Sequence, residues 1–217
     1  MTWFASHAYI TPTPLALTML SSHPVISQGL YFVDTLEGYR WCQPGIAHGL
    51  PPGGLVVVRE LCQNGSYEAK WFGADALPWS GIKGDAPCDV LMKPISPDVT
   101  SEVGDFQEAA PTVGSLKFFK ALSQASESPV VYYRHHTWGG DTEYEEAWLF
   151  GKNERLLTFV DNEHFTEQRI GLEAETQAGS ILSVIMREFG LVLPSPFFAL
   201  HARPFPWAQY KVTGTFS

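Results

Sequence analysis

The chain has 217 residues, of which 45% are hydrophobic and 13% aromatic, and its formal net charge is −9. These values are typical of a globular protein, and the acidic balance argues against a nucleic-acid partner or an anionic membrane surface, because both select for lysine and arginine. A basic protein partner is compatible with the charge. We expect a single domain over residues 1–217.

The three cysteines, Cys42, Cys62 and Cys88, are an odd number and show no CxxC spacing. Neither a disulfide framework nor a zinc ribbon is therefore indicated. Residues 1–20 lack the basic start and continuous apolar run of a secretion signal, and no stretch of about 20 apolar residues predicts a transmembrane helix. We expect a cytoplasmic protein.

The N-terminal segment is apolar but interrupted by prolines, so only Leu15–Leu20 is long enough for a short helix or strand. Leu30–Asp34 reads as a strand, and the glycine- and proline-rich residues 37–54 after it are expected to be loop. Cys42 and His48 lie in that loop without a second motif that would make them a metal or thiol site.

Asn64-Gly65 predicts a β-hairpin turn between strands at 55–62 and 67–73. A further strand is expected at 89–93. The polar, acidic and proline-bearing residues 94–114 follow it, and a joint would fall there if the chain divided into two subdomains.

A helix is predicted after this segment, because apolar residues recur at helical spacing from Leu116 to Leu122 and Ser115 stands where an N-cap oxygen is useful. Pro129 cannot continue the helix, so a strand should begin near Val130. The Gly139-Gly140 pair then predicts a tight two-residue hairpin turn.

This turn fixes a register for the two strands that it joins. The expected pairs are Val131 with Trp148, Tyr133 with Glu146, Arg134 with Glu145 and His136 with Glu143. Since strand side chains alternate, the apolar face comprises Val131, Tyr133, His135, Tyr144, Glu146 and Trp148. The opposite face is expected to be solvated and comprises Tyr132, Arg134, His136, Glu143, Glu145 and Ala147. A loop at 151–154 would set Leu157 opposite Trp148 in a third strand.

Glu146 is the ionisable residue that this register places among aromatic side chains. A buried carboxylate needs a partner, because in isolation it would neutralise rather than stay charged. One interpretation is structural, with the carboxylate held by a tyrosine hydroxyl, a histidine or an arginine. The other is catalytic, with Glu146 or His135 as a general base.

A metal site is predicted, as an alternative to plain surface polarity, at the hairpin tip. His136, Asp141 and Glu143 would supply one nitrogen and two oxygen ligands of the kind that zinc, manganese or iron accepts. In contrast, Asp161, Glu163 and His164 are better explained by a turn, because adjacent strand residues point to opposite faces. Dinucleotide, phosphate-loop, nucleophile-elbow and HExxH motifs are absent from the sequence.

A second long helix is predicted over 172–189, where apolar residues form one stripe before Gly190. The C-terminal segment is dense in aromatic residues and prolines, and we expect Phe197, Phe198, Phe205 and Trp207 to wrap over the core rather than leave an exposed patch.

These elements predict an α+β fold: a mostly antiparallel sheet built from hairpins, with two main helices packed on it. The first functional hypothesis is a non-enzymatic protein-binding domain of the immunity or regulatory type, which needs no cofactor and contacts its partner through Trp138, Arg134 and Glu145. The alternative is a metal-dependent hydrolase with its site at the 135–146 hairpin. A third hypothesis is a homo-oligomer with the aromatic C-terminal segment in its interface.

Overall fold

The computed structural model describes residues 3–23, 26–36, 46–47, 49–59, 113–138, 141–193, 197–201 and 205–214. The predictions made at Cys42, His48, the Asn64-Gly65 hairpin, 89–93 and 94–112 lie outside the described residues, as do Cys62 and Cys88.

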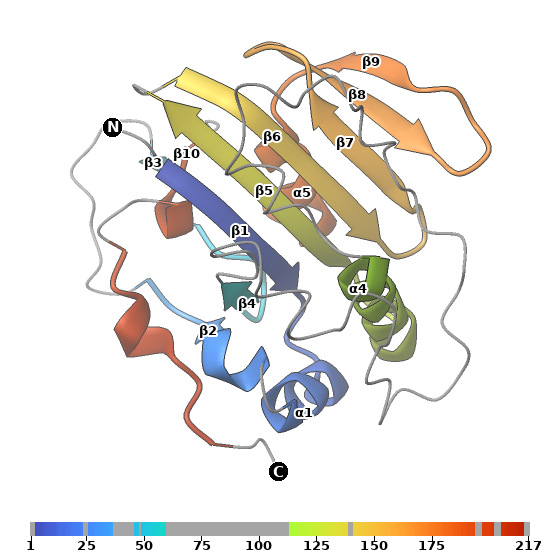
Figure 1. Ribbon diagram of the computed structural model, residues 1–217. Coiled ribbons are helices and arrows are strands. Elements are labelled where there is room, and N and C mark those ends of the chain that lie inside the picture. The colour runs from blue at the N-terminus through green and yellow to red at the C-terminus, as the bar shows by residue number, and fades with distance from the viewer. Residues whose placement is uncertain are drawn as a thin grey trace.

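Eight strands form one antiparallel sheet in the order β2-β4-β1-β5-β6-β7-β8-β9 (Figure 1). Their bounds are β1 Trp3–Ile10, β2 Leu30–Val33, β4 Leu55–Arg59, β5 Val130–Trp138, β6 Asp141–Phe150, β7 Arg155–Phe159, β8 His164–Arg169 and β9 Glu175–Ala178. The short strands β3 Ile46–Ala47 and β10 Phe197–Phe198 form a separate parallel pair.

The described residues contain three α-helices, α1 Pro14–Ser22, α4 Val113–Ser126 and α5 Ile181–Glu188. Single 3₁₀ turns occupy Ile26–Gly29, Ala199–His201 and Trp207–Tyr210. An antiparallel sheet combined with helices confirms the predicted α+β class. None of the helices in the described part of the chain is long and apolar enough to cross a membrane.

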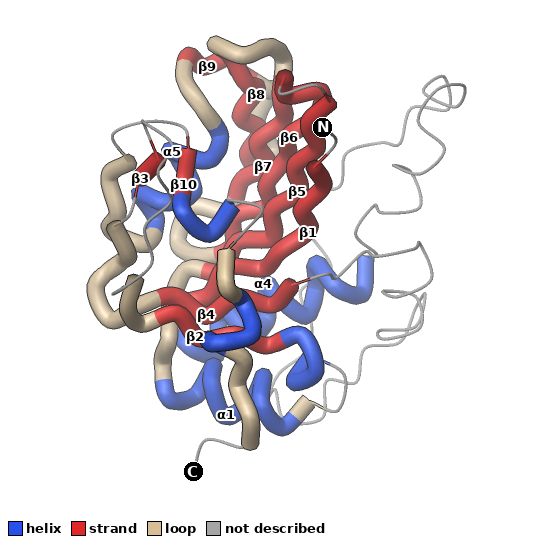
Figure 2. The backbone as a smooth tube through the Cα atoms, turned by 90° about the vertical axis from the view of Figure 1, so that its left-hand side faces the viewer, coloured by secondary structure: helices blue, strands red, loops and turns tan. Residues whose placement is uncertain are grey.

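The central strands of the sheet are buried on both faces. On one face, α1 and α4 contribute to a core that contains Tyr132 and Trp148. On the other face, α5 contributes to a core that contains Tyr133 and Leu149. Figure 2 shows the strand layer with α4 and α5 on opposite sides. Strands covered on both faces lose the alternation of apolar and polar residues that marks a strand in a sequence.

β1 is a central strand that the sequence interpretation missed. It pairs with β4 on one side and with β5 on the other, and Ala8–Ile10 are fully buried. Pro12 and Pro14 do not interrupt this strand, because it ends before them. Pro14 instead occupies the first turn of α1, whose N-cap is the hydroxyl of Thr13, a position where proline costs the helix nothing.

The helix predicted over 172–189 is wrong in its N-terminal half, which forms β9 and pairs with β8. Gly179 has a φ of +120° and turns the chain between β9 and α5. Ser180 then caps α5, since its hydroxyl accepts a hydrogen bond of 3.2 Å from the backbone N–H of Ser183. Pairing with a neighbouring strand outweighs a helical apolar stripe that is weak over these residues.

The register predicted from the Gly139-Gly140 turn holds only at the end of the hairpin. Trp138 pairs with Asp141 there, but His136 pairs with Tyr144. Glu143 is therefore an extra residue in β6, which makes the irregularity a β-bulge.

Every predicted pair beyond the bulge is wrong by one residue. Val131 pairs with Leu149 and Tyr133 with Ala147. The pairing predicted between β6 and β7 is separately wrong by one residue, because Leu156 rather than Leu157 faces Trp148. The two faces of β6 are consequently exchanged relative to the prediction.

The aromatic C-terminal segment packs on the core, as expected. Phe198 and Phe205 are buried in the core beside α5, and Trp207 is half-buried. The guanidinium of Arg59 lies 4.3 Å from the centre of the Trp207 ring. These contacts tie the segment to β4, and the predicted oligomer interface stays a prediction.

We predict that Gly54→Ala destabilises the protein more than Gly171→Ala. Both glycines have positive φ, +89° and +74°, so each alanine carries a left-handed strain of about 1–2 kcal/mol. A Cβ on Gly54 would also lie 2.6 Å from the carbonyl oxygen of Val33, whereas one on Gly171 would meet no atom within 4 Å. Urea denaturation measures both losses in the free energy of unfolding. Equal losses would contradict the close approach at Gly54.

Candidate functional site

Adjacent glutamates on β6, Glu145 and Glu146, point to opposite faces of the sheet. Because of the bulge, Glu146 pairs with Arg134 and Glu145 pairs with His135 in the strand register. Both carboxylates are buried, with exposed fractions of 8% for Glu145 and 2% for Glu146. The sequence identified these residues as special but assigned them to the wrong faces.

Glu146 forms a buried ion pair with Arg134, in which the guanidinium Nη1 lies 2.5 Å from carboxylate Oε1. The guanidinium also lies 5.3 Å from the centre of the Tyr144 ring. Burial and the neighbouring Glu146 carboxylate raise the pKa of Tyr144 well above its ordinary value. These contacts match the structural interpretation of Glu146. His135 lies on the opposite face of the sheet from Glu146, and the catalytic interpretation stays a prediction.

Glu145 is held on the α5 side of the sheet. Its Oε1 accepts hydrogen bonds from the Tyr133 hydroxyl, at 2.8 Å, and from the backbone N–H of Leu182, at 3.2 Å. Burial raises the pKa of the Glu145 carboxyl to about 7, although both hydrogen bonds oppose that rise. A carboxyl at the N-terminus of α5 fixes this helix to the sheet.

Arg134 and Glu145 were expected on a solvated face that contacts a partner, and this expectation is wrong. Arg134 is 3% exposed and Glu145 is 8% exposed. Both belong to buried hydrogen-bonding arrangements, because the bulge exchanges the faces and both faces are covered.

His135 lies beside Glu145 and stacks on Tyr133, with ring centres 6.0 Å apart and planes 14° apart. Its Nε2 is 3.5 Å from the hydroxyl of Thr142. Tyr9 packs against Tyr133 from β1. Tyr133 thus joins these rings to the Glu145 carboxyl, whose burial explains the direction of its pKa shift.

The structure describes the backbone of all three residues predicted to bind a metal, but the side chains of only Asp141 and Glu143. Asp141 begins β6, Glu143 is the extra residue of the bulge, and His136 pairs with Tyr144. Among the described residues, no group of three or more His, Cys, Asp and Glu side chains could hold a metal ion. The side chains of His136 and Trp138 lie outside what is described, so the metal site and the Trp138 contact stay predictions.

The loop between β7 and β8 is a turn, in agreement with the interpretation of Asp161, Glu163 and His164. The Asp161 carboxylate accepts a hydrogen bond from the backbone N–H of Glu163, and its Oδ1 lies 2.9 Å from Nδ1 of His164. The hydrogen bond from Glu163 is the main reason that the pKa of the Asp161 carboxyl is lowered.

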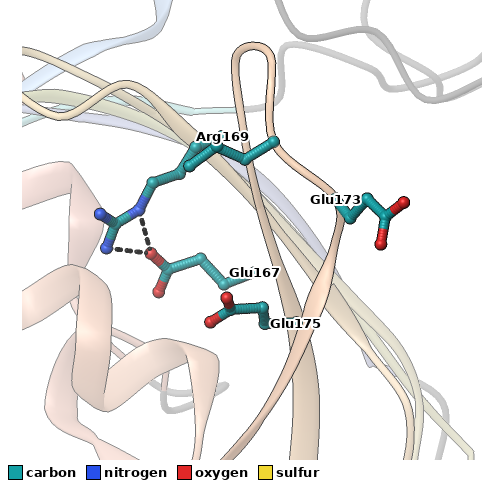
Figure 3. Close-up of a pocket in the computed structure, with 5 residues that line it drawn as sticks. Glu167, Arg169, Glu173 and Glu175 are labelled. Atoms are coloured by element: carbon teal, nitrogen blue, oxygen red, sulfur yellow. Dashed lines mark hydrogen bonds and ion pairs between the residues drawn. The ribbon is translucent and has the colours of Figure 1, made fainter.

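The β8–β9 hairpin carries a shallow pocket that the sequence interpretation did not find. We call it the acidic hairpin surface; it is lined by Glu167, Arg169, Leu172, Glu173 and Glu175. Figure 3 shows Glu167 and Glu175 on one side of the hairpin, while Glu173 points away from them. Three carboxylates and one guanidinium leave this surface acidic, and Leu172 is 61% exposed beside them.

Two arginines share the Glu167 carboxylate. Arg169 lies 2.6 Å from Oε1, and Arg155 lies 3.5 Å from Oε2. Arg155 also pairs with Glu188 at the end of α5. Glu167 is thus occupied within the protein, whereas Glu173 and Glu175 are exposed carboxylates on the same hairpin.

Comparisons with protein-family models, with curated proteins and with solved structures found no match.

A signal for the acidic hairpin surface is present in the sequence. Gly171 and Gly179 bracket the segment, and Ser180 stands directly before the apolar stripe of α5 as an N-cap residue. These three residues mark the boundary between β9 and α5, which the apolar spacing alone does not reveal.

We predict that removing one partner of the buried ion pair costs more than removing both. Arg134→Met leaves the Glu146 carboxylate buried without its cation and should lower the free energy of unfolding by about 3–5 kcal/mol. The double variant Arg134→Met, Glu146→Leu should lose less, because no buried charge remains. Chemical denaturation of both variants measures this difference. A double variant less stable than Arg134→Met would contradict the ion pair.

We predict a pH-dependent stability difference between the wild-type protein and Glu145→Gln. A raised carboxyl pKa stabilises the fold at low pH, and this contribution is lost as the pH rises from about 4.5, the ordinary value, to about 7. Between about pH 4.5 and 8, the free energy of unfolding of the glutamine variant should therefore rise relative to that of the wild type by on the order of 3 kcal/mol.

Denaturation curves at several pH values test this prediction. Groups that the substitution leaves unchanged cancel in the difference between the two proteins. A difference independent of pH would show that Glu145 titrates normally.

Proposed function

We propose that this protein is a non-enzymatic, cytoplasmic protein-binding domain of the regulatory or immunity type, and that it binds a basic partner through the acidic hairpin surface. The observation that carries the proposal is the exposed edge of the β8–β9 hairpin, where Glu173, Glu175 and Leu172 reach solvent together. An exposed apolar side chain beside carboxylates that outnumber the single guanidinium is a composition that favours a partner of opposite charge.

The net charge of the whole chain also favours a basic partner. A net charge of −9 attracts a basic protein over long range and speeds its association at low ionic strength. The location of the surface differs from the one expected from sequence, because Arg134 and Glu145 are buried. Trp138 remains a predicted contact at the end of the β5–β6 hairpin.

We predict that charge reversal on the acidic hairpin surface abolishes partner capture. The test variant is Glu173→Lys with Glu175→Lys, and the matched control is Asp34→Lys with Glu127→Lys, which changes two exposed carboxylates outside the hairpin. Affinity purification from the source cells with quantitative mass spectrometry compares the wild type with both variants. The partner should be lost only from the hairpin variant, and its affinity should fall as salt is added.

Equal capture by the hairpin variant and the wild type would contradict this surface. Capture lost equally in both variants would show that net charge, rather than the hairpin, attracts the partner.

A metal-dependent hydrolase is the second candidate function, favoured by the bulge between His136 and Thr137. Bulges re-aim side chains and occur often beside active sites. His136, Asp141 and Glu143 would be the ligands, with His135 as the remaining candidate general base once Glu146 is paired with Arg134.

The metal content of untagged protein, measured by inductively coupled plasma mass spectrometry, tests this candidate. About one equivalent of zinc, manganese or iron that is lost in His136→Ala is the result the hydrolase requires. Protein without stoichiometric metal would contradict it.

A further inference from the structure

The two edges of the eight-stranded sheet differ. The β2 edge is covered by the protein itself, since Tyr31 forms a β-bridge with Lys211 and the backbone N–H of Val212 donates to the carbonyl of Leu30 at 3.0 Å. The β9 edge ends the sheet on the other side, and within the described residues no strand or bridge lies beyond it. Figure 1 shows β9 at the outer margin of the sheet.

The pairing of β9 with β8 determines which backbone groups reach the open edge. The N–H of Gly179 donates to the carbonyl of Glu163 at 2.7 Å, and these two residues are opposite each other in the β8–β9 register. Hydrogen-bonded and non-hydrogen-bonded pairs alternate along an antiparallel ladder. Gln177 and Glu175 therefore turn their backbone groups towards β8, while Thr176 and Ala178 turn theirs outward.

β9 carries no proline, lysine or bulge, which are three of the features that block exposed edge strands. Its sequence is ETQA with an uninterrupted register to β8, so its protection is limited to its length of four residues and the charge of Glu175. All of its side chains are exposed except that of Gln177, which is half-buried. The outward N–H and C=O groups are therefore accessible to another extended chain.

The side chains of β9 favour a particular kind of strand. Glu175 pairs with Glu167, and both lie on the face of the sheet that carries Phe165 and α5. Glu167 is paired with Arg169 and Arg155, so a residue of an added strand on this face would meet the exposed carboxylate of Glu175, which favours lysine or arginine. On the opposite face, Thr176 and Ala178 are small and accept a β-branched residue.

We propose that β9 binds an extended segment of a partner protein by strand addition, with a basic side chain of that segment placed beside Glu175. The inference rests on the proposed function and adds its mode and the chemistry of the ligand. Main-chain hydrogen bonds supply affinity in this mode, and alternate side chains supply specificity. A second copy of the chain is disfavoured as the occupant, because it would bring like-charged hairpins together.

The first test uses a synthetic peptide, TKVKVKT with blocked termini, whose lysines share one face when extended. Titration into isotope-labelled protein, followed by amide resonances, gives the dissociation constant and the site. We expect the largest shifts in β8 and β9. Replacing the lysines by glutamate, or N-methylating alternate backbone nitrogens, should weaken binding at least tenfold. Shifts elsewhere, or equal binding of the N-methylated peptide, would overturn strand addition.

The second test changes the protein. Thr176→Pro removes one outward N–H without removing a hydrogen bond to β8, and proline is tolerated on edge strands for this reason. Thr176→Val is the matched control, because it keeps the N–H. Peptide binding should fall at least tenfold in the proline variant and stay within twofold in the valine variant. Equal binding by both would overturn the proposal, and the N-methylated peptide decides the question if the proline variant does not fold.

The same variants separate strand addition from protein binding in general. A partner that is lost in Glu173→Lys, Glu175→Lys but retained by Thr176→Pro would overturn strand addition and leave the proposed function standing. Concentration-dependent dimers that protect the Thr176 amide and exclude the peptide would assign the edge to a second copy instead.

Discussion

The extra residue Glu143 in β6 is the constraint on which the rest of the sheet depends. It shifts the β5–β6 register by one residue over the whole ladder from His136 to Val130. The shift sends Glu146 to Arg134 and Glu145 to the N-terminus of α5. Without the bulge each carboxylate would enter the opposite core without its partner, at the cost of an uncompensated buried charge.

The two carboxylates have different effects. The Arg134–Glu146 pair specifies the register, since a strand slip would separate two buried charges. Glu145 links the sheet to α5 and is the one of the two whose carboxyl pKa is raised by burial. Both carboxylates form contacts inside the protein. Exposed carboxylates lie farther along the sheet, on the β8–β9 hairpin. The protein covers its β2 edge with its own C-terminal segment, whereas no described residue pairs with the β9 edge.

The sequence was sufficient for the α+β class, the β5–β7 hairpins, the end of α4 before Pro129 and the burial of Phe198 and Phe205. It was insufficient where tertiary pairing decides the outcome. β1 has no alternation because both its faces are buried, and the bulge at Glu143 leaves no mark in residue spacing. β9 was hidden because Ala174 and Ala178 fit a helical stripe. The exposed surface was missed with it, although Gly179 and Ser180 marked the boundary.

Residue-resolved amide hydrogen exchange of the free protein tests the open β9 edge most directly. The account predicts an alternating pattern, with slow exchange at Glu175 and Gln177, whose N–H groups face β8, and fast exchange at Thr176 and Ala178. The Val212 amide, which donates to Leu30 at the covered edge, should be protected. Protection at Thr176 and Ala178 equal to that at Gln177 would show that the edge is already occupied and would contradict the account.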